Sequence, residues 1–199
     1  MKIYGDIYSG NCYKVKLTCS LLSLAYKWIP IDILKGETLT ESFLAINPAA
    51  KIPVVELDSG EILTESNAII YFLARDSDLW PSDAIAQTSV LQWQFFEQYS
   101  HEPNIAVARF IKYYLNMPED RRAEYESKMN PGYRALDLME KTLSQSPFLV
   151  GHECTIADIS LFAYTHVADQ GGFELERYEA IQNWLNRVQQ LDGFAAMDG

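Results

Sequence analysis

Residues 47–55 read NPAAKIPVV, a polar turn that runs directly into a short β-branched strand. The Ile52-Pro53 pair stands at the entrance of that strand, where a cis peptide bond would bend the chain and leave the Ile52 backbone able to pair with a ligand. Lys51 beside it could neutralise a ligand carboxylate. The alternatives are a trans bond and a solvated lysine, since only about 5–6% of X–Pro bonds in folded proteins are cis.

The sequence around this stretch predicts a small α/β domain. Strands are expected at residues 2–5 and 28–33, and a helix over residues 12–26 places its apolar side chains on one face. A strand, a helix and a second strand in about 30 residues form a right-handed βαβ unit with parallel strands. The remaining elements are expected at residues 40–46 (helix), 53–57 and 61–63 (hairpin), and 65–75 (helix). The order βαβαββα predicts a mixed four-stranded sheet.

The pattern changes near residue 77. The stretch DSDLWPSDA reads as a linker, and no convincing strand follows it. Pro103 predicts a kink or break in the first of the later helices, and TIAD at residues 155–158 resembles a capping box with Asp as its last residue. Helices are expected over residues 85–116, 119–145, 155–170 and 178–191. The expected domains are therefore residues 1–76 (α/β), 77–86 (linker) and 87–199 (all-helical).

Composition narrows the class of protein. The 199 residues are 48% hydrophobic, and 27 acidic against 16 basic side chains give a formal net charge of −11. This content indicates a folded protein, and the acidic excess argues against nucleic-acid or membrane-surface binding. We expect no signal peptide, and no transmembrane helix because no stretch of about 18 apolar residues occurs. The cysteines Cys12, Cys19 and Cys154 form no CxxC pair, which is typical of free thiols in the cytoplasm.

The loop at residues 7–12, IYSGNC, joins the first strand to the first helix. Open α/β sheets bind ligands at such loops, and the following helix N-terminus favours an anion such as a thiolate. Ser9 and Asn11 could add hydrogen-bond donors, although both also suit a turn and a helix cap. Cys12 could itself be a nucleophile near the helix N-terminus, but it has no CxxC partner.

The stretch LTESNAI at residues 63–69 begins another expected helix. The backbone N–H and hydroxyl of Ser66 could receive a carboxylate at the positive helix end, and Glu65 could bind an adjacent ammonium group. The alternative is structural: Thr64 caps the helix and Glu65 complements its dipole.

Three motifs now stand together: NPAAKIPVV, TESNAII at residues 64–70 and TIADISLF at residues 155–162. With the βαβαββα order and the helical second half, they resemble the cytosolic glutathione transferases over essentially the whole chain. The resemblance is to bacterial members that use serine or that are similar to disulfide-bond oxidoreductases. It implies a thioredoxin-like first domain that binds glutathione, a helical domain that contributes the electrophile site, a homodimer, a role in detoxification and no metal.

The resemblance also implies roles for individual residues. Glu65 and Ser66 would hold the γ-glutamyl end of glutathione. Ile52, before Pro53, would pair with its cysteinyl backbone. The glycyl carboxylate would face two lysines, Lys51 and Lys35.

The thiol-activating residue differs between classes of the family. The interpretation favoured here is that Ser9 and Asn11 act together, because Ser9-Gly10-Asn11 is similar to the Thr-x-Asn of the oxidoreductase-like members. Tyr8 is the nearest candidate for a tyrosine class, and Cys12 lies one residue beyond the position of the cysteine classes.

The electrophile site is expected within FFEQYSHEPNIAVARF at residues 95–110, where Tyr99, His101 and Arg109 are the candidates. Core packing with a solvated face is the alternative. The function implied is attack of the glutathione thiolate on small hydrophobic electrophiles. The alternatives are glutathione-dependent reduction of disulfides or peroxides on the same fold, and a non-catalytic interaction module.

Overall fold

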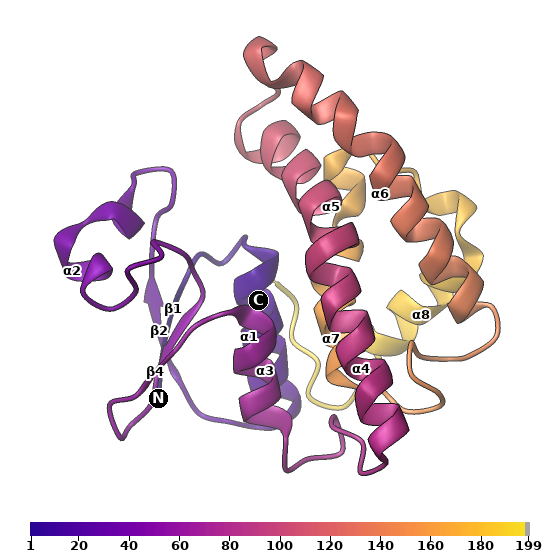
Figure 1. Cartoon of the computed structure of the whole chain (residues 1–199), viewed down its shortest axis with the longest axis horizontal. Coiled ribbons are helices and arrows are strands. Elements are labelled where there is room, and N and C mark those ends of the chain that lie inside the picture. The colour runs from indigo at the N-terminus through magenta and orange to yellow at the C-terminus, as the bar shows by residue number, and fades with distance from the viewer. Residues whose placement is uncertain (198–199) are drawn as a thin grey trace. The chain divides into compact units, whose positions relative to one another are not determined.

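The computed structural model describes residues 1–197, which form two compact units (Figure 1). One unit comprises Met1–Ser77 together with the C-terminal segment from Leu191, and the other comprises Asp78–Gln190. From the sequence, that C-terminal segment was expected in the helical domain. In the structure it packs with the first unit instead.

The first unit is built on a four-stranded sheet in the order β2-β1-β3-β4. Its strands are β1 (Lys2–Gly5), β2 (Lys27–Pro30), β3 (Val54–Glu56) and β4 (Ile62–Leu63). β1 pairs in parallel with β2, where Ile3 lies opposite Trp28, and antiparallel with β3, where Ile3 lies opposite Val55. β3 and β4 are antiparallel. The mixed sheet expected from the sequence is therefore confirmed.

Three helices accompany the sheet: α1 (Gly10–Leu21), α2 (Glu41–Leu44) and α3 (Ser66–Ala74). α1 and α3 lie side by side on one face, and α2 lies on the other side of the strands (Figure 1). The core between α1, α3 and the sheet is apolar and completely buried, with Ile3, Val15, Val55 and Ile69 among its members. This packing brings the N-termini of α1 and α3, and the loops before them, into one layer.

The C-terminal segment runs along α1. Tyr13 Oη donates a hydrogen bond to the Ala195 carbonyl at 2.8 Å, and Ser20 Oγ donates to the Gly193 carbonyl at 2.6 Å. Lys16 Nζ donates to the Met197 carbonyl at 3.0 Å. The three donors are three and seven residues apart, so they lie on one side of the helix.

The second unit is helical, and its described residues form no strand. Its α-helices are α4 (Ala84–Phe96), α5 (Glu102–Arg109), α6 (Arg122–Leu143), α7 (Ile156–Thr165) and α8 (Glu179–Gln189). A π-helical turn at Glu97–His101 joins α4 to α5, and another at Phe110–Tyr114 follows α5. The ribbon therefore continues past Pro103 without a break (Figure 1). Pro103 lies in the first turn of α5, directly after the π-helical turn, so the helix widens before the proline and continues past it.

α7 is buried along its whole length and begins with the expected capping box. Thr155 Oγ1 accepts from the Ala157 N–H at 3.3 Å, and the Thr155 N–H donates to Asp158 Oδ2 at 2.9 Å.

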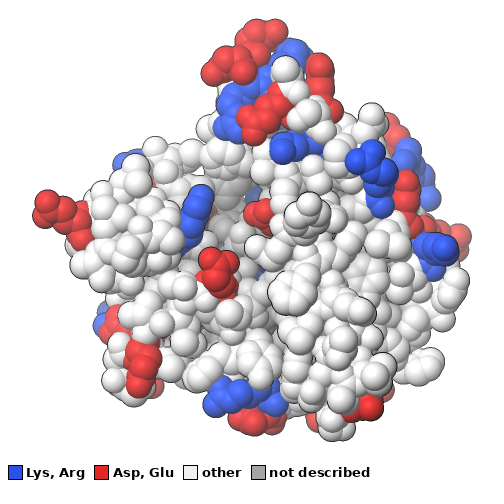
Figure 2. Space-filling model, in the orientation of Figure 1, with Lys and Arg blue, Asp and Glu red and all other residues white. Residues whose placement is uncertain are grey.

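Charged side chains gather at the start of α6, where Arg121–Glu124 and Arg122–Glu119 form ion pairs (Figure 2). No helix among residues 1–197 is long and apolar enough to cross a membrane.

Candidate functional site

The loop between β1 and α1 holds Ser9 at the position that caps the helix. The Ser9 N–H donates to the Asp6 carbonyl at 3.1 Å, and the Tyr8 N–H donates to Asp6 Oδ1 at 2.8 Å. Ser9 Oγ accepts the Cys12 N–H at 3.4 Å. Ser9 therefore caps α1, as the structural alternative predicted. Because a hydroxyl both donates and accepts, Ser9 Oγ can also donate its proton to a second acceptor. Ser9 is half-buried, so its hydroxyl remains accessible.

Asn11 and Ser66, which come from separate motifs, are in direct contact. Ser66 Oγ donates to Asn11 Oδ1 at 3.2 Å, and Lys14 Nζ donates to Ser66 Oγ at 3.3 Å. Lys14 is 0% exposed and Ser66 is also buried, whereas Asn11 is half-buried. The packing of α1 on α3 thus forms a chain of hydrogen bonds that begins at a buried ammonium group.

Lys14, which contacts the candidate site residue Ser66, was not among the residues that the sequence indicated. Lysine is among the residues least often fully buried, so a helical pattern normally assigns it to the solvent. The available signal was its position three residues after Asn11, which places both side chains on one side of α1.

Glu65 has an unusual backbone at the start of α3. Its φ of 65° and ψ of 109° are rare for a residue with a side chain, and such conformations cluster at functional sites. The alternative in which Thr64 caps the helix is wrong, because Glu65 occupies the capping position and makes no capping hydrogen bond through its side chain. Its carboxylate is exposed beside the N-terminus of α3.

The Ile52–Pro53 peptide bond is cis, as the sequence suggested. β3 begins at Val54, so Ile52 lies outside its ladder. The buried Asn47 holds the preceding turn: its Nδ2 donates to the Lys51 carbonyl at 2.8 Å, and its Oδ1 accepts the Ala49 N–H at 3.1 Å. The Lys51 side chain projects into solvent.

Lys35 is also exposed, but it is paired. Its Nζ lies 2.9 Å from Asp32 Oδ2, and this contact raises the pKa of Lys35 and lowers the pKa of Asp32. An anion that binds Lys35 must therefore share it with Asp32.

Cys12 is completely buried against Gly5. Burial raises the pKa of the Cys12 thiol to about 12, although the hydrogen bond with Ser9 opposes that shift. The thiol therefore stays protonated at neutral pH. The interpretation of Cys12 as a nucleophile is not compatible with this environment.

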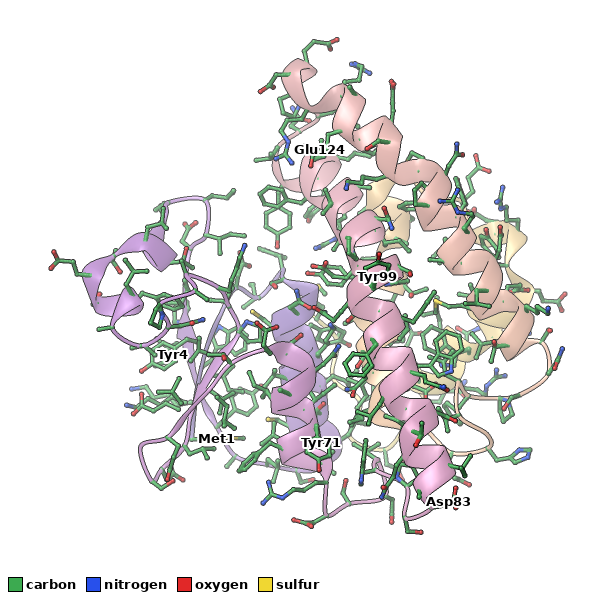
Figure 3. The ribbon with its side chains drawn as sticks, viewed as in Figure 1. Met1, Tyr4, Tyr71, Asp83, Tyr99 and Glu124 are labelled. Atoms are coloured by element: carbon green, nitrogen blue, oxygen red, sulfur yellow. The ribbon has the colours of Figure 1, made fainter. Side chains whose placement is uncertain are left out.

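The three electrophile-site candidates are not gathered in one place. Tyr99 is 88% exposed (labelled in Figure 3) and lines a cavity of about 280 Å³ in the helical unit. His101 is buried, with its Nε2 2.9 Å from Thr165 Oγ1. Arg109 is buried too, and its Nε donates to Gln170 Oε1 at 2.7 Å. The remaining residues around the cavity are Phe96, Ser100, Asn104, Pro131, Arg134 and Ala135.

Within residues 1–197, no group of three or more His, Cys, Asp or Glu could hold a metal ion. The features that do cluster in the first unit are two helix N-termini, half-buried donors and the cis-proline strand. Fold and site together define a class of two-unit enzymes that bind a small anionic thiol on a thioredoxin-like unit.

The comparisons with known proteins agree with this class. The glutathione S-transferase N-terminal domain matches residues 3–79, and the glutathione S-transferase C-terminal domain matches residues 101–192. The chain belongs to the glutathione S-transferase family, and it is a glutathione transferase. The thioredoxin-like and all-helical architecture inferred from the resemblance is thereby confirmed.

Individual relatives span almost the whole chain. A glutathione S-transferase from Pseudomonas fluorescens Pf-5 is 59% identical, with a TM-score of 0.97 and 98% of both chains covered. The disulfide-bond oxidoreductase YfcG of Escherichia coli is 29% identical over 202 residues, which cover 92% of this chain and 89% of YfcG. The glutathione transferase URE2P6 from Phanerochaete chrysosporium, in complex with oxidized glutathione, is 27% identical, with a TM-score of 0.86 and coverage of 96% and 91%.

Proposed function

We propose that the first unit binds glutathione across the N-termini of α1 and α3 and activates its thiol through Ser9 and Asn11. The observation that carries this proposal is the hydrogen bond between Asn11 and Ser66. It connects the residue proposed to bind the thiol with the residue proposed to bind the γ-glutamyl group, as expected for one ligand site. Helix N-termini stabilise anions, and hydroxyl and amide donors strengthen that effect. The thiolate then attacks a small hydrophobic electrophile.

The other contacts follow the shape of glutathione. The backbone N–H of Ser66 receives the γ-glutamyl carboxylate at the α3 N-terminus, and Glu65 binds the neighbouring ammonium group. The Ile52 backbone, held outside β3 before Pro53, pairs with the cysteinyl residue. Lys51 and Lys35 face the glycyl carboxylate.

Calorimetry with glutathione and with S-methylglutathione tests this site. Both ligands are expected to bind, because the γ-glutamyl and glycyl ends are the same in each. Conjugation of glutathione to an aryl halide such as chlorodinitrobenzene then measures transferase turnover. Absence of glutathione binding at millimolar concentration would favour the non-catalytic interaction module.

A second reaction at the same site is glutathione-dependent reduction of a disulfide. The likeness to YfcG and to URE2P6 with oxidized glutathione favours it as an alternative. The glutathione thiolate would attack one sulfur of the disulfide, the S–S bond would break, and the leaving thiolate would take a proton. A second glutathione would then release the remaining substrate thiol as oxidized glutathione forms. With a peroxide, the thiolate would attack one oxygen, the O–O bond would break, and an alcohol or water would leave. A second glutathione would convert the resulting sulfenic acid to oxidized glutathione and water.

Cys12→Ala is expected to leave both conjugation and disulfide reduction within about twofold of wild type, because a buried, protonated thiol is inert. Side-by-side assays with chlorodinitrobenzene and with a small disulfide provide the measurement. Cys19→Ala, which removes the next buried thiol of α1, is the matched control. Selective loss of disulfide reduction in Cys12→Ala would show chemistry at the protein's own cysteine.

We also propose that the protein is a homodimer that packs through one side of α4. Ile85 is 75% exposed, Phe95 is 69% exposed and Tyr99 is 88% exposed. Ile85 and Phe95 lie on α4, and Tyr99 lies in the π-helical turn that continues it, so the three exposed side chains belong to one continuous helical segment. Exposed apolar surface of this kind marks an interaction surface. A second copy of the chain would cover it.

Phe95→Glu is expected to convert the dimer to a monomer, because a carboxylate cannot be buried in an apolar interface without a partner. Light scattering coupled to size-exclusion chromatography measures the change. Ser127→Glu adds the same charge on an exposed position of α6 and controls for it. A Phe95→Glu protein of unchanged mass would contradict this interface.

We propose that Tyr99 contacts the electrophile. His101 and Arg109 are buried, so they would act indirectly, by anchoring the helical segment that carries Tyr99. Tyr99→Ala separates this role from dimerisation: a higher KM for the electrophile in an intact dimer indicates substrate contact.

We further place the protein in the cytoplasm, since Cys12, Cys19 and Cys154 are all free and buried. It has no expected nucleic-acid or membrane partner.

A further inference from the structure

We propose that Lys14 is a positioning residue of the glutathione site, which orients the Asn11 amide and lowers the pKa of the bound thiol. This inference rests on the proposed function. Its basis is the chain of contacts from Lys14 Nζ to Ser66 Oγ at 3.3 Å and from Ser66 Oγ to Asn11 Oδ1 at 3.2 Å. Lys14 and Ser66 lie beneath the site, and Asn11 is the member of the chain nearest solvent.

The chemistry of the three groups fixes the direction of the chain. An ammonium group has three donors and no acceptor, so Lys14 can only donate to Ser66. The Ser66 hydroxyl, which accepts that hydrogen bond, gives its single proton to Asn11 Oδ1. The carbonyl end of the Asn11 amide is then bound, so the group that this amide can offer to a ligand is its NH₂ donor. An anionic sulfur is stabilised by that NH₂ end and would be repelled by the carbonyl end.

The charge of Lys14 adds a second effect. The residue is 0% exposed, so its field is screened less than that of a surface lysine. A positive charge on the order of 10 Å from a thiolate, at the effective dielectric of a protein interior, changes the thiol pKa by about one unit. Both effects favour the same state: a deprotonated glutathione sulfur next to Asn11.

The test compares Lys14→Met, Lys14→Arg and Lys16→Met. Methionine keeps a long side chain but removes the donors and the charge, whereas arginine keeps both. Lys16 lies on the same helix and donates to the Met197 carbonyl, so Lys16→Met is a matched loss of one lysine away from Ser66. The readout is the thiolate absorbance of glutathione at saturating concentration, titrated from pH 5 to pH 9, with calorimetric binding and thermal unfolding measured in parallel.

Lys14→Met is expected to raise the apparent pKa of the bound thiol by about one unit, with a roughly tenfold lower kcat/KM below that pKa. Lys14→Arg should restore most of both values, and Lys16→Met should match wild type. If Lys14→Met does not fold, Lys14→Leu takes its place, since it also removes both the donors and the charge. A thiol pKa in the folded Met or Leu variant equal to that of Lys16→Met would overturn the inference.

The two proposals fail in different ways. A wild-type protein that binds no glutathione, or that binds it without any thiolate, refutes the proposed function. A wild-type protein that forms the thiolate while Lys14→Met forms it equally well refutes only the role of Lys14. A double-mutant cycle adds a further check: in a Ser66→Ala background, Lys14→Met should lose part of its effect, because the hydrogen-bond chain is already cut.

Discussion

Asp158→Ala is expected to lower the free energy of unfolding of the helical unit by about 4 kcal/mol or more. The carboxylate is completely buried and accepts four hydrogen bonds. Oδ1 accepts from the Leu149 N–H and from Trp184 Nε1, both at 2.9 Å, and Oδ2 accepts from the Thr155 N–H at 2.9 Å and from Thr155 Oγ1 at 3.1 Å. Alanine leaves all these donors buried and unpaired, at a cost of about 1–3 kcal/mol each.

The size of this effect comes from what Asp158 connects. It holds the start of α7, the chain at Leu149 and the indole of Trp184 on α8, so one side chain ties three segments of the unit together. Burial raises the pKa of Asp158, and the four hydrogen bonds oppose that shift. The contribution of Asp158 to stability therefore comes from its two acceptor oxygens, which an apolar side chain lacks.

Thermal unfolding measures the loss. For a protein of this size about 4 kcal/mol corresponds to a drop in Tm of about 8–16 °C. Asp158→Asn keeps the shape but turns an NH₂ group toward N–H donors, so it should be destabilising as well. Asp169→Ala removes an exposed aspartate of the same unit and controls for charge. A Tm for Asp158→Ala within 2 °C of that control would contradict the assigned role.

Much of this architecture could be predicted because it is encoded locally. The TIAD capping signal lies within four residues, and the structure realises it at Thr155 and Asp158. The βαβ unit and the hairpin likewise predicted a mixed sheet, which the parallel β1–β2 pair and the antiparallel β3–β4 pair confirm. Helix ends differed by a few residues, as for α1, which begins at Gly10 rather than residue 12. Ends depend on hydrogen bonds that the hydrophobic pattern does not report.

The parts that could not be predicted depend on contacts between distant segments. The C-terminal segment was assigned by its neighbours in sequence, whereas its position depends on Tyr13 and Ser20 of α1. The burial of Lys14 was not predicted, because nothing local shows that Ser66, fifty-two residues later, receives its ammonium group. Nothing in the sequence indicates the π-helical turn before Pro103. A proline predicts a kink or break, whereas in the structure the turn before it is π-helical and the helix continues.

Loss of both thiol donors is expected to have the largest effect on activity. The Ser9→Ala/Asn11→Ala double variant should raise the pKa of the bound glutathione thiol by about two units and lower kcat/KM near pH 6.5 by about 50-fold. A free thiol has a pKa near 8.5, and lowering it by about two units requires roughly 2.7 kcal/mol of preference for the thiolate. Two hydrogen bonds to a charged acceptor contribute about 1.5–3 kcal/mol each, and a helix N-terminus about 0.3–1 kcal/mol.

The pH dependence distinguishes this loss from a simple loss of binding. A donor that stabilises the thiolate matters only below the pKa of the unassisted thiol, so the deficit of the double variant should shrink as the pH rises through about 8.5. A loss of binding would instead raise the KM for glutathione at every pH. Each single variant should show a smaller rise in thiol pKa. Asn11→Asp should be worse than Asn11→Ala, because it places a carboxylate beside the thiolate.

Tyr8→Phe provides the control for the tyrosine alternative. Tyr8 belongs to the same loop as Ser9, and its side chain is exposed. We expect Tyr8→Phe to keep the thiolate absorbance and turnover of wild type. If that variant loses the thiolate while the Ser9/Asn11 double variant retains it, the activating group is the phenol. The α1 N-terminus would then serve only to bind glutathione, because a helix end alone provides too little stabilisation for a two-unit shift.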